Sequence, residues 1–305
     1  MSFSVLISTF ANNILPIVFL GGAGFILGKL LHVDSRSLGR VAFYIFSPVL
    51  IFNLLLENHV NLREAIGVIS LTVCSVALMG IITFLLGTLF KIERAALTSI
   101  LITTMFGNTG NYGLPLVSFA FGEKALSYAG IFFVTTTFLF YTLGVVIASL
   151  GHMNLKDALL GLFKIPTLYA VILAILINAF QIQIPEPVDR AVQLAAGGTI
   201  PLMLILLGVE LTRVELSANL RAMQLSVGLR LLIAPILALT LAALFGIQTV
   251  ARQGSVTEAS MPAMVSSTVL ATEYQLDSKL VTAIVFISTL LSPLTLTPLL
   301  VFLAR

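Results

Sequence analysis

The sequence predicts an all-α integral membrane protein with ten transmembrane helices, arranged as two inverted five-helix repeats in which helices four and nine are broken. Three observations lead to this fold class. Of the 305 residues, 58% are hydrophobic and only 10% are charged, whereas a soluble globular domain carries about 25% charged residues. The charges divide the chain into long apolar runs, and similar segments recur about 155 residues apart.

The apolar runs are mostly as long as the roughly 18–20 residues that a helix needs to cross about 30 Å of hydrocarbon. A transmembrane barrel would show alternating segments of ~10 residues instead, so helices are expected. The first run lacks a basic start and is too long for the apolar part of a signal peptide, so we expect it to be retained. The expected spans are approximately 5–30, 41–56, 65–90, 96–121, 125–150, 165–182, 191–211, 220–245, 255–272 and 280–303.

The basic residues predict the orientation in the membrane. Ten of the 16 lysines and arginines fall in odd-numbered connections, five on the opposite side, and Arg230 lies inside a span. Because cytoplasmic loops carry the excess of basic residues, both termini are predicted to be extracytoplasmic, in an inner or plasma membrane. The basic residues are spread along the connections and are not clustered with aromatic residues, so nucleic acid is not expected as a partner. The ten are Lys29, Arg36, Arg40, Lys91, Arg94, Lys156, Lys164, Arg213, Arg221 and Lys279; the five are Arg63, Lys124, Arg190, Arg252 and Arg305.

Three matches indicate an internal repeat. A proline is followed nine residues later by a glutamate in span two (Pro48, Glu57) and again in span seven (Pro201, Glu210), 153 positions further on. Spans three and eight end alike at an offset of 155, and spans five and ten begin at about 125 and 280, again 155 positions apart. The chain therefore divides into halves 1–152 and 153–305. Since each half holds an odd number of helices, the second enters the membrane from the other side, which is a recurrent feature of secondary transporters.

Spans four and nine carry helix-breaking residues in their middles. The 28 residues Ala95–Gly122 contain no charge, yet they hold Gly107, Gly110, Gly113 and Pro115. In span nine, Pro262 interrupts a charge-free run of 14 residues, Ala259–Thr272. Either break alone is compatible with a kink from close packing, but breaks at matching positions of two inverted halves point to a binding site near the midplane. We expect Pro115 and Pro262 to approach each other there.

Several of these segments resemble the auxin efflux carrier family. The residues that carry the resemblance are Asn108-Thr109-Gly110-Asn111-Tyr112-Gly113-Leu114-Pro115, the segment around Pro262, "ATEYQLD" at 271–277 and "STLLSPLTLTP" at 288–298. The resemblance covers nearly the whole chain. It implies a sodium/proton-antiporter-like fold of elevator type, with scaffold helices at approximately 5–56 and 165–211 and transport helices at approximately 65–150 and 220–303. It also implies crossing of spans four and nine, extracytoplasmic termini and a homodimer through the scaffold.

The resemblance and the breaks together select the expected substrate-binding residues. Half-helix N-termini offer free N–H groups and about half a positive charge to a carboxylate. Asparagine side chains can satisfy loose backbone and ligand together. Tyr112 could stack on a ligand, or it could belong to the core. The substrate-binding set is Asn108, Thr109, Gly110, Asn111, Tyr112, Gly113, Pro115, Met261, Pro262 and Ala263.

Glu258, four residues before Pro262, is the expected site of a coupling ion, because ionisable groups inside the membrane are costly and usually functional. The segment "EASM" also resembles the sodium-linked bile-acid symporters, which share the fold and bind sodium at a glutamate in this place. By that resemblance, Asn111 and the run Thr135, Thr136 and Thr137 would supply neutral oxygens. The ion is sodium or a proton, and no other cofactor is expected. The alternatives for Glu258 are a cap of the half-helix and a bystander at the surface.

Arg230 lies near mid-depth in span eight, and three interpretations of it stay open. It is a counter-charge for an anionic substrate, a partner for Glu258, or a lock on the carbonyl groups of a broken helix. Glu57 and Glu210 fall at predicted span ends, where an interfacial charge is the simpler interpretation. The small residues of span one, Gly21-Gly22-Ala23-Gly24 and Gly28, predict close helix packing.

The function predicted is secondary transport of small organic anions, such as malate, malonate or auxin-like indole acids. An intramembrane enzyme is not expected, because no histidine lies in a span and no zinc motif is present. A channel or uniporter for organic anions is the first alternative, since broken helices also line pores. A ligand-sensing membrane protein of the same fold is the second.

Overall fold

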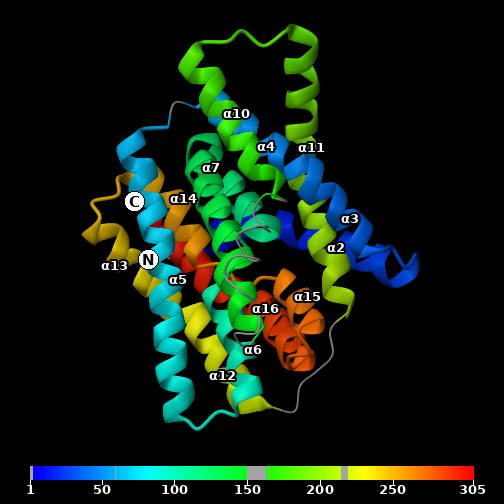
Figure 1. The fold of residues 1–305 in the computed structure, drawn as a ribbon, viewed down its shortest axis with the longest axis vertical. Helices are drawn as coiled ribbons and strands as arrows, with labels where there is room; N and C mark the ends of the chain where they lie inside the picture. The colour runs from blue at the N-terminus through cyan, green and yellow to red at the C-terminus, as the bar shows by residue number, and fades with distance from the viewer. Residues whose placement is uncertain (1–2, 59, 150–162, 164, 214–218) are drawn as a thin grey trace.

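The computed structural model of the chain describes residues 3–58, 60–149, 163, 165–213 and 219–305 (Figure 1). Every regular element in this part is helical, apart from one isolated antiparallel bridge between Gly107 and Ala263. The first half contains α1 Phe3–Thr9, η1 Phe10–Ile14, α2 Leu15–Leu30, α3 Ser35–Val41, η2 Ala42–Phe46, α4 Ser47–Glu57, α5 Leu62–Leu89, α6 Arg94–Met105, η3 Thr109–Gly113, α7 Leu114–Leu139, η4 Phe140–Gly144 and α8 Val145–Ala148. The second contains α10 Pro166–Phe180, α11 Glu186–Glu210, η5 Leu211–Arg213, α12 Leu220–Gly228, η6 Leu229–Ile233, α13 Ala234–Leu244, α14 Thr249–Ala259, α15 Ser266–Glu273 and α16 Ser278–Leu303.

Seven helical stretches of the described chain are long and apolar enough to cross a membrane: Phe3–Leu30, Ser35–Glu57, Leu62–Leu89, Thr109–Ala148, Glu186–Glu210, Leu220–Leu244 and Ser278–Leu303. Two shorter apolar helices are α6 and α10. Large apolar side chains are exposed on the outer helix faces, for example Phe19, Leu85, Ile236 and Leu290. Such a surface suits hydrocarbon rather than water, so the chain is a helical integral membrane protein.

The stretch Thr109–Ala148 contains the end of predicted span four and nearly all of predicted span five. Gly122 separates the two, with φ of 74° and ψ of −170°. A residue without Cβ adopts this conformation readily, so the stretch consists of two helices that meet at Gly122. The number of segments that cross the membrane stays a prediction.

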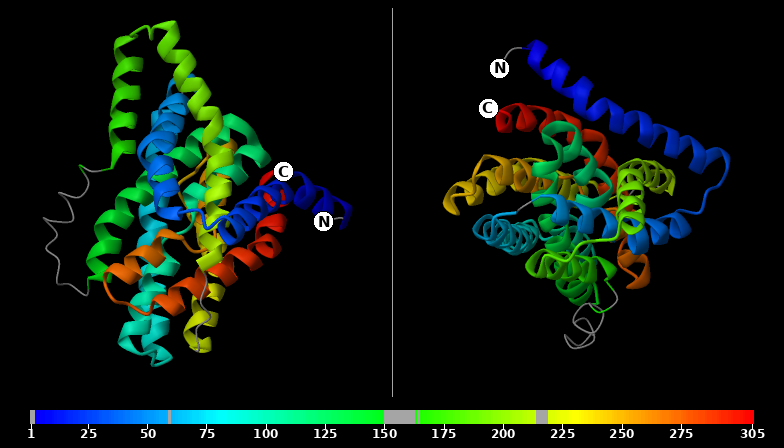
Figure 2. Two further views of the ribbon diagram at one scale, coloured as in Figure 1. Left: turned by 90° about the vertical axis from the view of Figure 1, so that its right-hand side faces the viewer. Right: turned by 90° about the horizontal axis from the view of Figure 1, so that it is seen from above.

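We name two groups of helices after the scaffold and transport sets that the resemblance implies. In the panel group, which is α1–α4, α10 and α11, helix α11 contacts α2 and α4, and α10 contacts α4. In the core group, which is α5–α8 and α12–α16, helix α7 contacts α5 and α14, and α16 contacts α6, α12 and α14. Helix α1 also packs on α16, and the two termini lie on one side of the molecule (Figure 2).

Glycines allow the closest approach within the panel group. A Cβ on Gly24 of α2 would lie 2.1 Å from the carbonyl oxygen of Ile205 in α11, and one on Gly208 would lie 1.9 Å from the carbonyl oxygen of Gly21. Any side chain at these positions would force the helices apart. The close packing predicted from the glycines of span one is confirmed.

Four prolines follow a π-helical turn. The turns η1, η2, η3 and η6 end two residues before Pro16, Pro48, Pro115 and Pro235. Proline has no N–H and its ring crowds the preceding turn, and a widened turn relieves both effects at such a site.

This arrangement corrects the position of the first break. Helix α6 ends at Met105, Phe106 is extended with φ of −114° and ψ of 121°, and the chain becomes helical again at Thr109. The break therefore lies at 106–108, whereas Pro115 lies inside the second half-helix.

Three predicted boundaries also shift. Span two was expected to begin near 41, but its helix begins at Ser35 and includes Arg36 and Arg40. Span nine was expected to begin near 255, but α14 begins at Thr249 and includes Arg252, whose guanidinium lies over the ring of Phe302, 5.3 Å from its centre. Span seven begins at Glu186 rather than near 191, and an exposed Glu186–Arg190 ion pair lies in this first part of the helix. The predicted boundary between the two repeats, at 152/153, lies outside the described residues.

Candidate functional site

The two helix breaks meet and satisfy each other's backbone. The N–H of Asn108 donates to the carbonyl oxygen of Pro262 at 2.8 Å, and the N–H of Met264 donates to that of Phe106 at 3.0 Å. These bonds flank the bridge between Gly107 and Ala263. Backbone groups freed inside a membrane protein need such partners, so each break provides hydrogen-bond partners for the other. We call this paired segment the crossing.

Two serines of α16 form hydrogen bonds with residues at or next to the crossing. Ser288 Oγ accepts a hydrogen bond from the N–H of Ala263 at 3.1 Å, and Ser292 Oγ donates to the hydroxyl of Tyr112 at 3.1 Å. Both serines are fully buried. The segment "STLLSPLTLTP" was noted in the sequence only as part of a resemblance, and these two roles were missed.

Arg230 binds the carbonyl ends of both broken helices. Its Nε donates to Met261 O at 2.6 Å, while its two Nη atoms donate to Thr104 O and Ala259 O, each at 3.1 Å. The residue is 3% exposed. A cation at a helix C-terminus is stabilised by the helix dipole, and here one guanidinium serves α6 and α14 together. Of the three interpretations, the contacts match the lock on carbonyl groups.

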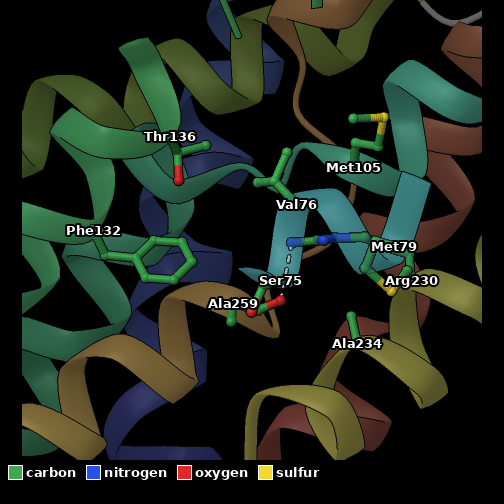
Figure 3. Close-up of a pocket in the computed structure, with 10 residues that line it drawn as sticks. Ser75, Val76, Met79, Met105, Phe132, Thr136, Arg230, Ala234 and Ala259 are labelled. Atoms are coloured by element: carbon green, nitrogen blue, oxygen red, sulfur yellow. Dashed lines mark hydrogen bonds between the residues drawn. The ribbon is translucent and has the colours of Figure 1, made fainter. Parts of the chain in front are cut away.

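A small cavity, which we call the crossing cavity, lies beside Arg230 (Figure 3). Its volume is about 10 Å³, close to the minimum for one water molecule. Ser75 Oγ and Thr136 Oγ1 are buried at this cavity without a hydrogen-bond partner. Ser75 and Arg230 stand 155 positions apart in the sequence, as do Met79 and Ala234, which also line the cavity.

Glu258 is the second-last residue of α14 and is 0% exposed. Neither carboxylate oxygen has a hydrogen-bond partner. Its close neighbour is Gly113 of η3, where an added Cβ would lie 2.1 Å from Oε2 and 2.6 Å from Cδ. An ionised carboxylate buried in this way is very costly unless it is neutralised, so the group requires a proton or a cation when it is buried.

Other polar atoms near the crossing are also buried without partners. They are Asn108 Nδ2, Thr109 Oγ1 and Thr257 Oγ1. Thr257 precedes Glu258 in the chain, and Thr109 lies four residues before Gly113. No group of three or more histidine, cysteine, aspartate or glutamate side chains lies together in the described part of the chain. A cation at Glu258 would therefore depend on neutral oxygens of this kind.

A larger pocket, which we call the interface pocket, lies between the two groups of helices and has a volume of about 380 Å³. Residues of the core group at its wall include Asn108, Gly110, Asn111, Thr137 and Ser266; residues of the panel group include Arg36, Arg40, Ser47, Met203 and Glu210. Pockets for small molecules have about this size. The pocket thus combines amide groups at the crossing with two arginines of α3.

Asn111 joins the two groups across this pocket. Its Nδ2 donates to Oε2 of Glu210, the last residue of α11, at 3.2 Å. The sequence analysis favoured an interfacial charge for Glu210 and did not assign it to the site. The signal was present in the repeated proline–glutamate spacing, but that spacing does not specify which partner the glutamate meets.

The structure brings only part of the predicted substrate set to the pocket. Asn108, Gly110 and Asn111 line it, whereas Tyr112 is packed in the hydrophobic core. Thr109 is fully buried, and Gly113 and Pro115 are also buried, with Gly113 against Glu258. Met261, Pro262 and Ala263 contribute through their backbones, which accept from Arg230, accept from Asn108 and donate to Ser288 respectively.

The predicted threonine run does not act as one unit. Thr135 Oγ1 bonds back to Ile131 O at 2.8 Å, Thr136 lines the crossing cavity, and Thr137 lines the interface pocket. The amide of Asn111 is likewise directed to Glu210. The participation of Asn111 and these threonines in an ion site at Glu258 stays a prediction.

Comparison with known proteins gives a consistent result. The chain matches the family model described as "Membrane transport protein" over residues 9–156 and 151–300. It is 28% identical over 292 residues to an uncharacterized transporter of Methanocaldococcus jannaschii, covering 93% of this chain and 94% of the relative. It is 27% identical over 286 residues to an uncharacterized transporter of Methanothermobacter thermautotrophicus, again covering 93% and 94%.

Proposed function

The chain belongs to the membrane transport protein family, which comprises the auxin efflux carriers, and from this premise we propose that it is a secondary transporter of small organic anions. The observation that carries the proposal is the crossing of two broken helices at a pocket whose walls come from both groups of helices. Such a site fits alternating access, because relative movement of the two groups changes the side to which the pocket opens.

The groups at the interface pocket support an anionic substrate. Asn108 and Asn111 offer amide donors, and the half-helix that begins at Thr109 turns its N-terminus toward the break. A helix N-terminus carries about half a positive charge and free N–H groups. Arg36 and Arg40 add two cations at the same pocket. Carboxylates such as malate or malonate, or indole acids of the auxin type, are the proposed substrate class.

An elevator-type motion is the proposed mechanism. The panel group would be the scaffold and would form the contact of a homodimer, and the core group would move with the site. The residues 155 positions apart that share the crossing cavity, Ser75 with Arg230 and Met79 with Ala234, support ten helices in two inverted repeats. Since Arg36 and Arg40 belong to a connection predicted to be cytoplasmic, we assign the open side of the pocket to the cytoplasm and both termini to the opposite side.

Glu258 is the proposed coupling residue. A ligand shifts an alternating-access equilibrium only through a difference in its interaction with the two states. Neutralisation of a buried carboxylate by sodium or by a proton provides such a difference, because Glu258 packs on Gly113 of the half-helix that bears Asn111. The unpartnered hydroxyls of Thr109 and Thr257 are the proposed neutral oxygens if the ion is sodium.

The test is counterflow in proteoliposomes that contain the purified protein. Vesicles loaded with unlabelled malate, malonate or indole-3-acetate should take up the labelled compound transiently against its gradient, at a rate that saturates. Thermal-shift measurements against the same compounds, with and without sodium and from about pH 5 to 8, should show stabilisation by the transported one, because a ligand of the native state raises the melting temperature. Flux without saturation or counterflow would show a channel, and ligand binding without flux would favour a sensor.

A further inference from the structure

Glu210 brings a carboxylate of the protein itself to the proposed anion site. It ends α11 in the panel group, it is half-buried, and it lines the interface pocket together with Asn111. Its Oε2 accepts a hydrogen bond from Asn111 Nδ2 at 3.2 Å. The bond joins residues 99 positions apart, one in each group of helices.

This contact presents a chemical conflict with an anionic substrate. A substrate carboxylate would seek the same amide donor, since a carboxylate only accepts hydrogen bonds and the amide nitrogen is the donor atom of asparagine. Both carboxylates at one amide would repel each other strongly at such short range and low exposure. Although the amide nitrogen carries two N–H donors, this repulsion means that the binding of one carboxylate at Asn111 disfavours the binding of the other when both are ionised.

We propose that the carboxylate of Glu210 occupies the substrate's place on Asn111 in the empty protein, and that the substrate carboxylate displaces it on binding. This rests on the proposed transport of organic anions. Displacement would also remove a bond between the panel and core groups, so that substrate binding and release of the core group become one event. An empty carrier would keep the bond and would move less readily.

The repeat supplies a matched control. Glu57 ends α4 as Glu210 ends α11, and it follows its proline at the same nine-residue spacing. It is exposed and lines a different pocket, together with Glu64 and Lys124. Glu57→Ala therefore removes the same charge from the corresponding place without touching Asn111.

The experiment measures dissociation constants of malate, malonate and indole-3-acetate by isothermal titration with the purified full chain. Glu210→Ala should lower the dissociation constant of every compound that the wild type binds by about tenfold, which corresponds to about 1.4 kcal/mol. Glu210→Gln, which keeps the shape and an acceptor for Asn111, should lower it by a smaller factor, and Glu57→Ala should leave it unchanged. Binding by Glu210→Ala where the wild type shows none would also support displacement.

Weaker or unchanged binding in Glu210→Ala and Glu210→Gln, while Asn111→Ala loses binding, would overturn the inference and leave the proposed function intact, because Glu210 would then only orient Asn111. If no compound binds to the wild type or to either Glu210 variant, the proposed function and the inference both fail. A second readout needs no ligand: hydrogen exchange of the backbone amides of 109–113 should be faster in Glu210→Ala than in the wild type. Equal exchange rates in the ligand-free wild type and the ligand-free Glu210→Ala variant would contradict the role of the Asn111–Glu210 bond in joining the panel and core groups.

Discussion

Replacement of Arg230 is the sharpest test of how the crossing is held together. The side chain makes three hydrogen bonds, of 2.6, 3.1 and 3.1 Å, to carbonyl oxygens of Met261, Thr104 and Ala259. Loss of the donor leaves three buried acceptors, and each unsatisfied group costs about 1–3 kcal/mol. Water that enters next to the crossing cavity will recover part of this, so we expect Arg230→Gln to lower the free energy of unfolding by about 3–5 kcal/mol.

Arg230→Lys should recover about half of that loss, because an ammonium keeps the charge but has no planar fork to reach three carbonyl groups. Arg221, an exposed residue of α12, is the matched control. Arg221→Gln should change the free energy by no more than about 0.5 kcal/mol. Unfolding is followed by circular dichroism in detergent, since the chain contains no tryptophan.

The same unfolding measurement distinguishes hydrogen bonding of Arg230 to the carbonyl groups from an ion pair between Arg230 and Glu258. If Arg230 stabilises the fold through the carbonyl groups, Glu258→Gln should cost about the same in the wild type as in Arg230→Gln. A double-mutant coupling above about 2 kcal/mol would instead identify Glu258 as the main partner. A loss in Arg230→Gln no larger than in Arg221→Gln would refute the lock.

Three further variants test the site. Asn111→Ala should weaken substrate binding by about 1–3 kcal/mol with little loss of folding, and unchanged affinity in a folded variant would place the site elsewhere. Glu258→Gln should keep substrate binding but abolish its dependence on sodium or pH, measured by titration calorimetry; a variant that keeps the wild-type dependence would assign the ion to another residue. Gly113→Ala should cost about 1–3 kcal/mol by overpacking against Glu258 and impair ion coupling, whereas Gly22→Ala, with nothing within 4 Å of the added Cβ, should do neither.

The predictions from sequence were most accurate where the signal is local. Apolar runs located the helices of the membrane protein because each span must bury its own backbone hydrogen bonds. Glycines of span one predicted close helix packing, which the structure shows between α2 and α11, and the two breaks were assigned to the correct spans. Boundaries failed where polar residues continue a helix beyond the apolar run, as at Thr249 in α14 and Glu186 in α11.

The first break shows why position is harder to predict than existence. Gly107, Gly110, Gly113 and Pro115 were all taken as breaking residues of span four, but a π-helical turn contains Gly110 and Gly113 and accommodates Pro115, and the non-helical residues are 106–108. What selects that place is pairing with the segment around Pro262, more than 150 residues away. No residue near Gly107 specifies this partner.

By itself, the sequence determined the membrane class, the helical character, the offset of about 155 residues, the two broken spans and the resemblance that the family match bears out. These depend on composition and on periodicity within one segment, which the chain carries locally. Only the tertiary structure decided that Arg230 binds the carbonyl ends of two helices, that Gly113 lies against Glu258, and that Glu210 shares a pocket with Asn111. The physical reason is that a side chain's partner depends on which helices pack together, and those partners come from segments tens to more than a hundred residues apart.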